Sequence, residues 1–226
     1  MTELHVLRVF VGPDGRGGNP LGVFLDGASI APDRRQAVAT ELGYSETVFV
    51  DDAMEGAIRI FTPGRELPFA GHPSVGTAWL FRETGAPATT LRPPAGEVPF
   101  RHDPERTWIR ARPEWVHPIL IEQLASAADV EGHDGQSMGE TGRYVWAWID
   151  EAAGILRSRY FATDVGIRED EATGAAAVVM GGLIGRPLTI RQGVGSEILV
   201  RPAADGTVEV GGRVELVATR EHDTGR

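Results

Sequence analysis

Two glycine-flanked turns each carry one ionisable side chain and lead into a segment rich in small residues. The first runs from Gly71 to Ala78 and the second from Glu169 to Ala176. At an offset of 98 residues, His72 aligns with Asp170. A duplicated half-site of this kind predicts two similar lobes that face each other across one cleft, with these two side chains on opposite walls. An imidazole and a carboxyl group placed in this way suit proton transfer on a small acid.

The two turns are also candidates for binding an anion. Each lies where a loop becomes a helix, and the helices are expected at 74–83 and 173–184. The first N–H groups of a helix have no partner within it, and the helix dipole adds positive potential there. A substrate carboxylate can satisfy these donors; the alternative is a cap supplied by Ser74, Thr173 or water. Because the turn occurs twice, we favour a bound carboxylate, with these substrate-binding candidates: Gly71, Pro73, Ser74, Thr173, Gly174 and Ala175.

Glu46 and Asn19 are two further polar candidates. Glu46 precedes the β-branched segment 47–50, which is expected to be a strand. Burial without a partner would raise the pKa of its carboxyl group toward the range useful in acid–base catalysis; the alternative is an exposed loop glutamate. Asn19 is the only Asn in the chain and lies in a Gly-rich loop expected over 12–20, where the simple interpretation is a turn residue.

The composition removes several classes of reaction. The chain has 226 residues and no Cys, and because its 22 basic residues are all Arg it has no Lys. Thiolate nucleophiles, Schiff bases, covalent pyridoxal phosphate and P-loops are therefore excluded. The other histidines lack metal-ligand spacing, so no metal site is expected. What remains for proton transfer or nucleophilic attack is Glu, Asp, His, Tyr, Ser and Thr.

Charge and hydropathy indicate the setting in which the protein works. A net charge of −10 argues against nucleic acid or an anionic membrane as the partner. No apolar run approaches the length of a membrane span, and the segment 1–10 carries charged residues where a signal peptide would be apolar. We therefore expect a cytoplasmic location and a small-molecule partner.

The expected elements divide into two strand-rich halves. In the first half, strands are expected at 4–10, 21–25, 47–50, 57–61, 97–101 and 107–112, and helices at 32–42 and 74–83. In the second half, the expected elements are strands at 144–149, 157–161, 188–192, 197–201, 207–210 and 213–217, helices at 118–128 and 173–184, a loop at 129–141 and a frayed tail at 221–226. The small-residue helices are expected to be buried on all sides. We infer an α+β fold of two similar lobes, residues 1–112 and 113–226, each a barrel-like sheet around a central helix.

Several motifs resemble those of the phenazine biosynthesis PhzF-like family. They are Asn19-Pro20, Ser45–Val50, Phe61-Thr62-Pro63, Arg65–Pro73, Glu169-Asp170, Thr173-Gly174 and Val210–Gly212. The resemblance spans nearly the whole chain. It implies the diaminopimelate epimerase-like fold, a homodimer, and catalysis without a metal or organic cofactor. It also implies that Glu46 moves a proton between carbons of a cyclic dihydro-hydroxyanthranilate, that His72 and Asp170 assist, and that the helix N-termini hold the substrate carboxylate.

The sequence departs from the family pattern at the second turn. The family usually has Asp-Pro-x-Thr-Gly-Ser, whereas this chain reads Asp170-Glu171-Ala172-Thr173-Gly174-Ala175. Ala175 lacks the serine hydroxyl expected to contact substrate, and Glu171 adds a negative charge beside the cleft. The segment 113–160 is also shorter than is usual for the family. We therefore expect a substrate other than the phenazine precursor.

The leading hypothesis is a cofactor-independent isomerase that moves a proton within a small carboxylate-bearing molecule, with Glu46 as general acid and base. The rival is a non-catalytic protein that binds or senses a small acid on the same scaffold, which the missing hydroxyl at Ala175 favours. Retention of Glu46, His72 and Asp170 disfavours this rival, because binding alone does not need a buried glutamate facing a His–Asp pair. A metal-dependent lyase would require a metal site that the histidine spacing does not suggest.

Overall fold

The computed structural model describes residues 1–135, 141–162 and 167–225. The elements of the first half are β1 (Thr2–Val11), β2 (Gly17–Phe24), α1 (Pro32–Leu42), β3 (Glu46–Asp52), β4 (Ala57–Phe61), β5 (Glu66–Leu67), α2 (Gly71–Thr84), β6 (Thr90–Leu91), β7 (Val98–His102) and β8 (Thr107–Ala111). Those of the second half are the 3-10 turn Pro113–Trp115, β9 (Leu120–Gln123), α3 (Ala127–Gly132), β10 (Arg143–Asp150), β11 (Ile155–Ala162), β12 (Ile167–Asp170), α4 (Gly174–Ile184), β13 (Leu188–Gln192), β14 (Ser196–Pro202) and β15 (Val208–His222).

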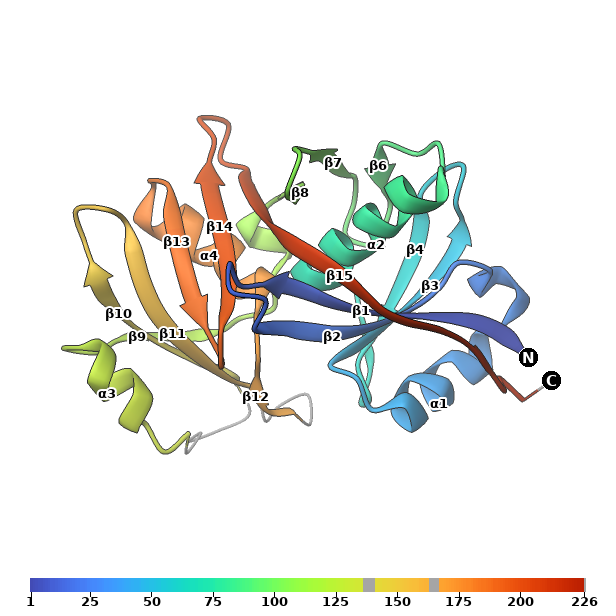
Figure 1. The fold of residues 1–226 in the computed structure, drawn as a ribbon, viewed down its shortest axis with the longest axis horizontal. Helices are drawn as coiled ribbons and strands as arrows, with labels where there is room; N and C mark the ends of the chain where they lie inside the picture. The colour runs from blue at the N-terminus through green and yellow to red at the C-terminus, as the bar shows by residue number, and fades with distance from the viewer. Residues whose placement is uncertain (136–140, 163–166, 226) are drawn as a thin grey trace.

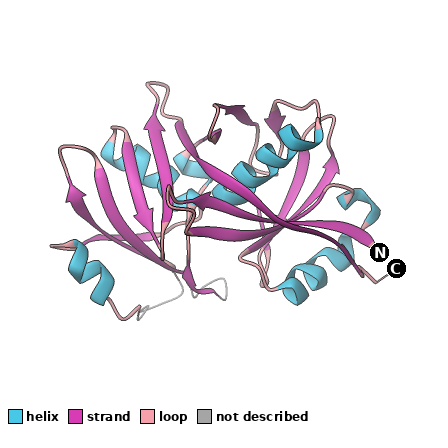
Figure 2. Ribbon diagram, viewed as in Figure 1, coloured by secondary structure: helices cyan, strands magenta, loops and turns pink. Residues whose placement is uncertain are grey.

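One continuous mixed sheet joins the two halves. Its strands follow the order β5-β4-β3-β2-β1-β15-β14-β13-β11-β10-β9. Figure 1 shows α2 and α4 in the middle of the molecule, with α1 and α3 toward the periphery of the two halves. The colouring of Figure 2 makes the dominance of strands plain. The mixed α+β fold inferred from the sequence is confirmed, whereas the lobe boundary between residues 112 and 113 stays a prediction.

A repeated unit underlies both halves. In the first, β2 and β3 are parallel with α1 between them in the chain, and β3 turns into antiparallel β4. In the second, β9 and β10 are parallel around α3, and β10 turns into β11. Parallel neighbours require such a crossover segment. The two hairpin turns contain Gly56 and Gly154, with φ of 74° and 71°, a backbone conformation in which glycine avoids strain.

The central helices are buried because their small residues allow the sheet to approach closely. A side chain at Gly76 of α2 would lie 2.4 Å from a Leu21 methyl group, and one at Gly181 of α4 would lie 2.5 Å from a Val208 methyl group. In α2, the run from Gly71 to Ala78 is buried throughout. Burial of α4 is incomplete, because Leu183 near its C-terminus is 62% exposed. The expectation of burial on all sides is therefore corrected for the last turn of α4.

The segment 118–128 is not the helix that was expected. It forms strand β9, which pairs in parallel with β10, and α3 begins only at Ala127. The spacing of Ile119, Ile121 and Leu124 fits either element, and pairing with a buried strand decides it here. The expected loop at 129–141 is also partly wrong, because α3 extends to Gly132. Ser126 caps this helix by accepting a hydrogen bond from Asp129 N. Residues 133–135 and 141 lie in no helix or strand, as expected, and residues 136–140 lie outside the described residues.

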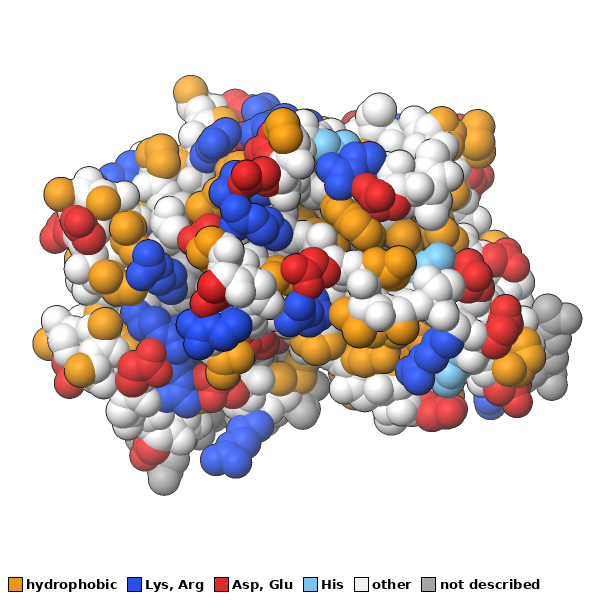
Figure 3. Space-filling model, in the orientation of Figure 1, with side chains coloured by type: hydrophobic (Ala, Val, Ile, Leu, Met, Phe, Trp, Pro, Cys, Tyr) orange, Lys and Arg blue, Asp and Glu red, His pale blue; other side chains and the backbone are white. Residues whose placement is uncertain are grey.

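The C-terminal part of the chain is one strand rather than two strands and a tail. The start of β15 pairs with β14 and β8, and its residues 213–222 pair with β1. This pairing orders residues 221 and 222, and Thr224 is buried beside Thr2, so the expected fraying does not occur there. Figure 3 shows acidic and basic side chains interspersed on the face that it presents. Residues of β15 take part in such pairs, from Arg8 to Glu215 and from Arg213 to Glu105.

Among the described residues, no helix is long and apolar enough to cross a membrane.

Candidate active site

The N-termini of the two central helices meet. A side chain added at Gly71, the first residue of α2, would lie 2.4 Å from the carbonyl carbon of Gly174, the first residue of α4. Neither N-cap residue, Ala70 of α2 or Thr173 of α4, caps its helix with its own side chain. Ser74 Oγ instead donates to Ala70 O at 2.7 Å, and Thr173 Oγ1 donates to Asp170 Oδ2 at 2.6 Å. The capping alternative therefore fails for both hydroxyls, and two helix dipoles reinforce each other at one point.

The two turns are not related by the offset that their sequences suggest. The first residues of the helices, Gly71 and Gly174, are 103 residues apart, whereas the turn glycines Gly56 and Gly154 are 98 apart. The connection from hairpin to helix is thus five residues longer in the second half. His72 consequently lies within the first turn of α2, while Asp170 ends β12, four residues before α4. The two side chains meet at one site without occupying equivalent positions.

Asn19 is the hub of a buried hydrogen-bond network. It lies in β2 opposite Val9 rather than in a loop, and it is fully buried, which corrects the interpretation as a turn residue. The reversal is made instead by Gly15 and Gly17, which adopt positive φ. Its Nδ2 donates to Asp170 Oδ1 at 2.7 Å and to Ala172 O at 2.9 Å, and lies 3.3 Å from His72 Nδ1. In addition, Ser45 Oγ donates to Asn19 Oδ1 at 2.9 Å.

Gln192 extends this network behind Asp170. Its Nε2 donates to Asp170 O at 2.9 Å and to Thr173 Oγ1 at 2.8 Å, and its Oε1 accepts from Thr173 N at 3.2 Å. The side chain is 1% exposed. Sequence analysis missed Gln192, because a lone polar residue at the end of a strand carries no signal of its own.

Glu46 and His72 face each other at the head of the site. Glu46 is the first residue of β3, and its side chain is only 12% exposed, so the alternative of an exposed loop glutamate is wrong. Its Oε2 lies 3.2 Å from His72 Nε2. The pair lies within ion-pair distance but without hydrogen-bond alignment, and both atoms lack another hydrogen-bond partner among the described residues. Each atom is therefore available to a third group that lies beside both.

Burial sets the charge state of these groups. It lowers the pKa of His72 to about 3, against a raising contribution from the backbone of Pro20. It raises the pKa of Glu46 well above the ordinary value, and the charge of Asp170 adds to that rise. His72 is therefore neutral at pH 7, and Glu46 keeps its proton to a higher pH than an exposed glutamate does. A carboxyl group of this kind can act as both base and acid near neutral pH.

A cavity of about 440 Å³ adjoins these groups. Four of the predicted site residues line it: Glu46, Asp170, Thr173 and Ala175. The other six, Asn19, Gly71, His72, Pro73, Ser74 and Gly174, are buried beneath it. Ala175 presents a methyl group where the resemblance leads us to expect a hydroxyl.

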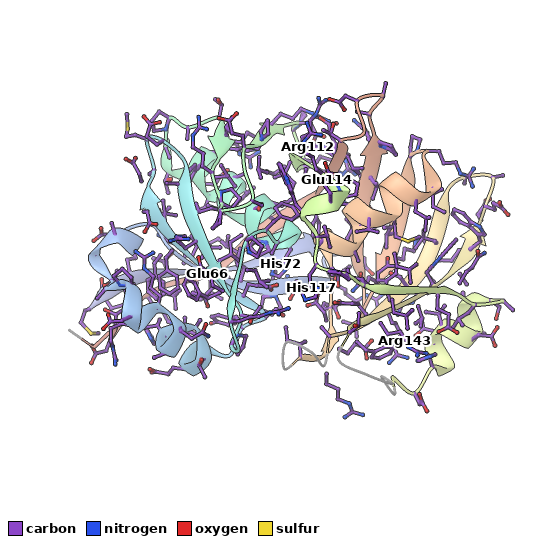
Figure 4. The ribbon with its side chains drawn as sticks, turned by 180° about the vertical axis from the view of Figure 1, so that it is seen from behind. Glu66, His72, Arg112, Glu114, His117 and Arg143 are labelled. Carbon is purple, nitrogen blue, oxygen red and sulfur yellow. The ribbon has the colours of Figure 1, made fainter. Side chains whose placement is uncertain are left out.

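The far wall of the cavity comes from segments that sequence analysis did not assign to the site. They are residues 65–69, the connection 114–119 and parts of β11 and β12. Trp115 packs on Phe69, with ring centroids 5.8 Å apart. Figure 4 labels His72 and His117 at the junction of the two halves and Glu66 in the N-terminal half. A Trp and a His directly after Pro113 are the signal that could have pointed to this connection.

Asp170 is expected to make the stability of the protein depend on pH. Burial raises its pKa to about 6, against the lowering effect of hydrogen bonds from Thr173, Asn19 and Ser45. Since this pKa exceeds the ordinary 3.8, the folded state binds the proton more tightly. The stability that this group contributes is complete below pH 3.8 and lost as the pH rises through 6.

The measurement is thermal unfolding of the wild type and of Asp170→Asn between pH 3.5 and 8. The stability of the variant relative to the wild type should rise between about pH 4 and pH 6 and then level off. The exposed Asp33→Asn serves as the control. Wild-type and Asp170→Asn curves that run parallel over this range would contradict the raised pKa.

Comparison with known proteins adds independent evidence. A model of the family described as phenazine biosynthesis-like protein matches residues 12–149. A trans-2,3-dihydro-3-hydroxyanthranilate isomerase of Pseudomonas aeruginosa is 30% identical over 221 aligned positions, which cover 80% of each chain. A protein of Pasteurella multocida described as an uncharacterized isomerase is 28% identical over 270 positions, covering 96% of this chain and 92% of that protein.

The fold also has solved counterparts. A protein of Clostridium difficile described as a putative phenazine biosynthesis PhzC/PhzF protein superposes with a TM-score of 0.77 at 19% identity, covering 99% of this chain and all of that one. At that level of identity the likeness supports the fold alone.

Proposed function

Because the chain belongs to the phenazine biosynthesis-like protein family and is an isomerase-type enzyme, we propose that it moves a proton within a small carboxylate-bearing substrate. Glu46 is the general acid and base of this reaction. The observation that carries the proposal is the buried Glu46 carboxyl group, which lies 3.2 Å from a neutral imidazole and at the wall of the cavity.

The proposed chemistry conserves atoms and electrons. The Glu46 carboxylate takes a proton from one carbon of the substrate, and the C–H electron pair delocalises toward the substrate carboxylate. The two helix N-termini at Gly71 and Gly174 stabilise the added negative charge. Glu46 then returns the proton to another carbon, so that one C–H bond has broken and one has formed with no net oxidation.

His72 and Asp170 support this exchange in different ways. The neutral His72 offers Nε2 beside the Glu46 oxygen, where it can share the proton in transit. Asp170 accepts hydrogen bonds from Asn19 and Thr173 at 2.7 and 2.6 Å and so holds these two side chains in place at the site. Its charge also helps to raise the pKa of Glu46.

Deuterium incorporation from solvent tests the proposal. The protein is incubated in D₂O with a panel of small unsaturated carboxylates, beginning with trans-2,3-dihydro-3-hydroxyanthranilate, the compound named for the Pseudomonas aeruginosa relative. We expect carbon-bound deuterium to appear in at least one member by mass spectrometry and NMR. Glu46→Gln should incorporate deuterium about 10²–10⁴-fold more slowly.

The second candidate function is binding of a small acid without turnover. The observation that favours it is Ala175, which lines the cavity with a methyl group where a substrate-binding hydroxyl was expected. Saturable binding of carboxylates across the panel, without any uptake of deuterium, would favour this candidate over the isomerase.

A further inference from the structure

Residues 170–172 hold the β1–β2 hairpin from two sides. Asp170 and Ala172 both accept hydrogen bonds from the Asn19 side chain. Glu171, between them, is directed toward the β13–β14 turn. Its Oε1 accepts from Ser196 Oγ at 2.8 Å, and Val194 N donates to its carboxylate at 3.0 and 3.1 Å.

Ser196 carries this contact back to the hairpin. Its hydroxyl accepts a hydrogen bond from Gly18 N at 2.8 Å while it donates to Glu171. One hydroxyl can do both, and the residue is only 1% exposed. Gly18 directly precedes Asn19. The chain of contacts from Glu171 through Ser196 to Gly18 therefore ends next to the hub of the site.

Glycines allow the turn of the β1–β2 hairpin and the β13–β14 turn to approach so closely that no side chain would fit between them. A side chain at Gly12 would lie 2.0 Å from Gly195 O, and one at Gly17 would lie 2.4 Å from Ser196 N. One at Gly193 would lie 2.1 Å from Glu171 Oε2. Backbone meets backbone at Gly12 and Gly17, and at Gly193 the backbone meets the Glu171 carboxylate. The hydrogen bonds of Glu171 and Ser196 lie within this close contact between the hairpin and the second half.

Glu171 also acts through its charge. Burial raises its own pKa, and its negative charge adds to the rise in the pKa of Asp170. Glu171 therefore affects the site through its hydrogen bonds and through its charge. The two effects can be separated with variants that remove one or both.

We propose that Glu171 is a positioning residue for the proton transfer: through Ser196 and Gly18 it holds Asn19 in place on Asp170 and His72. This inference rests on the proposed function for its link to turnover. The geometric part stands on the contacts of Glu171, Ser196 and Gly18 and can be tested without a substrate.

Asn19 supplies an unusually clean signal for the test, because it is the only Asn in the chain. Selective ¹⁵N-Asn labelling gives one backbone amide signal and one side-chain NH₂ pair. In the wild type, the side-chain NH₂ group donates hydrogen bonds to Asp170 and Ala172, so its protons should exchange slowly with solvent. In Glu171→Ala and Ser196→Ala we expect shifted side-chain signals that exchange about tenfold faster, since a hydrogen bond to a charged acceptor has been lost.

Two further variants complete the set. Glu171→Gln keeps an acceptor for Ser196, so its Asn19 signals should stay nearer to the wild type than those of Glu171→Ala. Glu169→Ala is the matched control: it removes the neighbouring glutamate, which pairs with Arg159 at 2.7 Å and takes no part in these contacts. Circular dichroism and thermal unfolding establish that each variant is folded.

Kinetics connect the contacts to the reaction. We expect Glu171→Ala and Ser196→Ala to lower kcat about tenfold with KM within about twofold of the wild type, because the helix N-termini still bind the carboxylate. The acidic limb of the pH profile should move to lower pH in Glu171→Ala and Glu171→Gln, which lose the charge beside Asp170, but not in Ser196→Ala.

Unchanged Asn19 signals and exchange in folded Glu171→Ala and Ser196→Ala would overturn the inference, as would an equal effect in Glu169→Ala. If no carboxylate takes up deuterium with the wild type, the proposed function fails, while the Asn19 signals still decide whether Glu171 positions the hub.

Discussion

Glu46→Gln is expected to lower the rate of deuterium incorporation by about 10²–10⁴-fold while leaving the fold and carboxylate binding intact. The substitution is nearly isosteric, and the side-chain amide cannot exchange a proton with carbon. Carboxylate binding should persist because the helix N-termini at Gly71 and Gly174 are untouched. Exchange is followed by mass spectrometry, and binding by calorimetry with the same compound. Unchanged exchange in this variant would remove Glu46 from the mechanism.

The same variant is expected to be more stable than the wild type at alkaline pH. Burial raises the pKa of Glu46 above the ordinary 4.5, so the folded protein binds this proton more tightly than the unfolded chain does. The stability that this group contributes is complete below pH 4.5 and lost as the pH rises through the raised value. Gln has no proton to lose, so the difference in Tm between variant and wild type should grow as the pH rises above 4.5. Glu41→Gln, at an exposed position of α1, is the control.

Gly71→Ala is expected to destabilise the protein by about 1–3 kcal/mol and to weaken carboxylate binding. The added methyl group would lie 2.4 Å from the Gly174 carbonyl carbon, and neither backbone can yield without separating the two helix N-termini. For a chain of this size each kcal/mol lowers Tm by about 2–4 °C. The reduced affinity follows because the N–H groups of the two helices no longer converge.

Gly174→Ala should behave in the same way, since its methyl group would lie 2.7 Å from His72 N. Gly132→Ala in α3 is the matched control: nothing lies within 4 Å of the added atom, and alanine favours a helix. We expect its Tm to equal or exceed that of the wild type. A Gly71→Ala protein with wild-type Tm and affinity would show that the helix N-termini do not need their close approach.

The elements that the sequence predicts best are those whose ends carry local signals. Helix α1 spans Pro32–Leu42 as expected, because Pro32 fits the first turn and Gly43 adopts the left-handed conformation that ends it. Strand β4 likewise spans Ala57–Phe61. Helix α2 begins three residues earlier than expected, because proline is tolerated in a first turn, where its missing N–H costs nothing.

What the sequence could not show is decided by distant partners. Strand β9 exists because β10 pairs with it, and β15 is one strand because β1 continues where β8 ends. At the site, the meeting of Glu46, His72 and Asp170 was predicted, whereas the roles of Gln192 and the connection 114–119 were not. Asn19 was named as a candidate, but its position in a strand follows from the pairing of β2 with β1, which local composition does not reveal.

Strand β15 has a consequence for how the protein is made. It pairs Thr2 with His222 and so completes the sheet of the N-terminal half with residues more than 200 positions away. Until Val208–His222 has been synthesised, β1 has no neighbour on that side and presents unpaired N–H and C=O groups. Closure of so long a loop is slow. During synthesis the N-terminal half therefore exposes an unpaired strand edge. Chaperones protect chains in this state from aggregation.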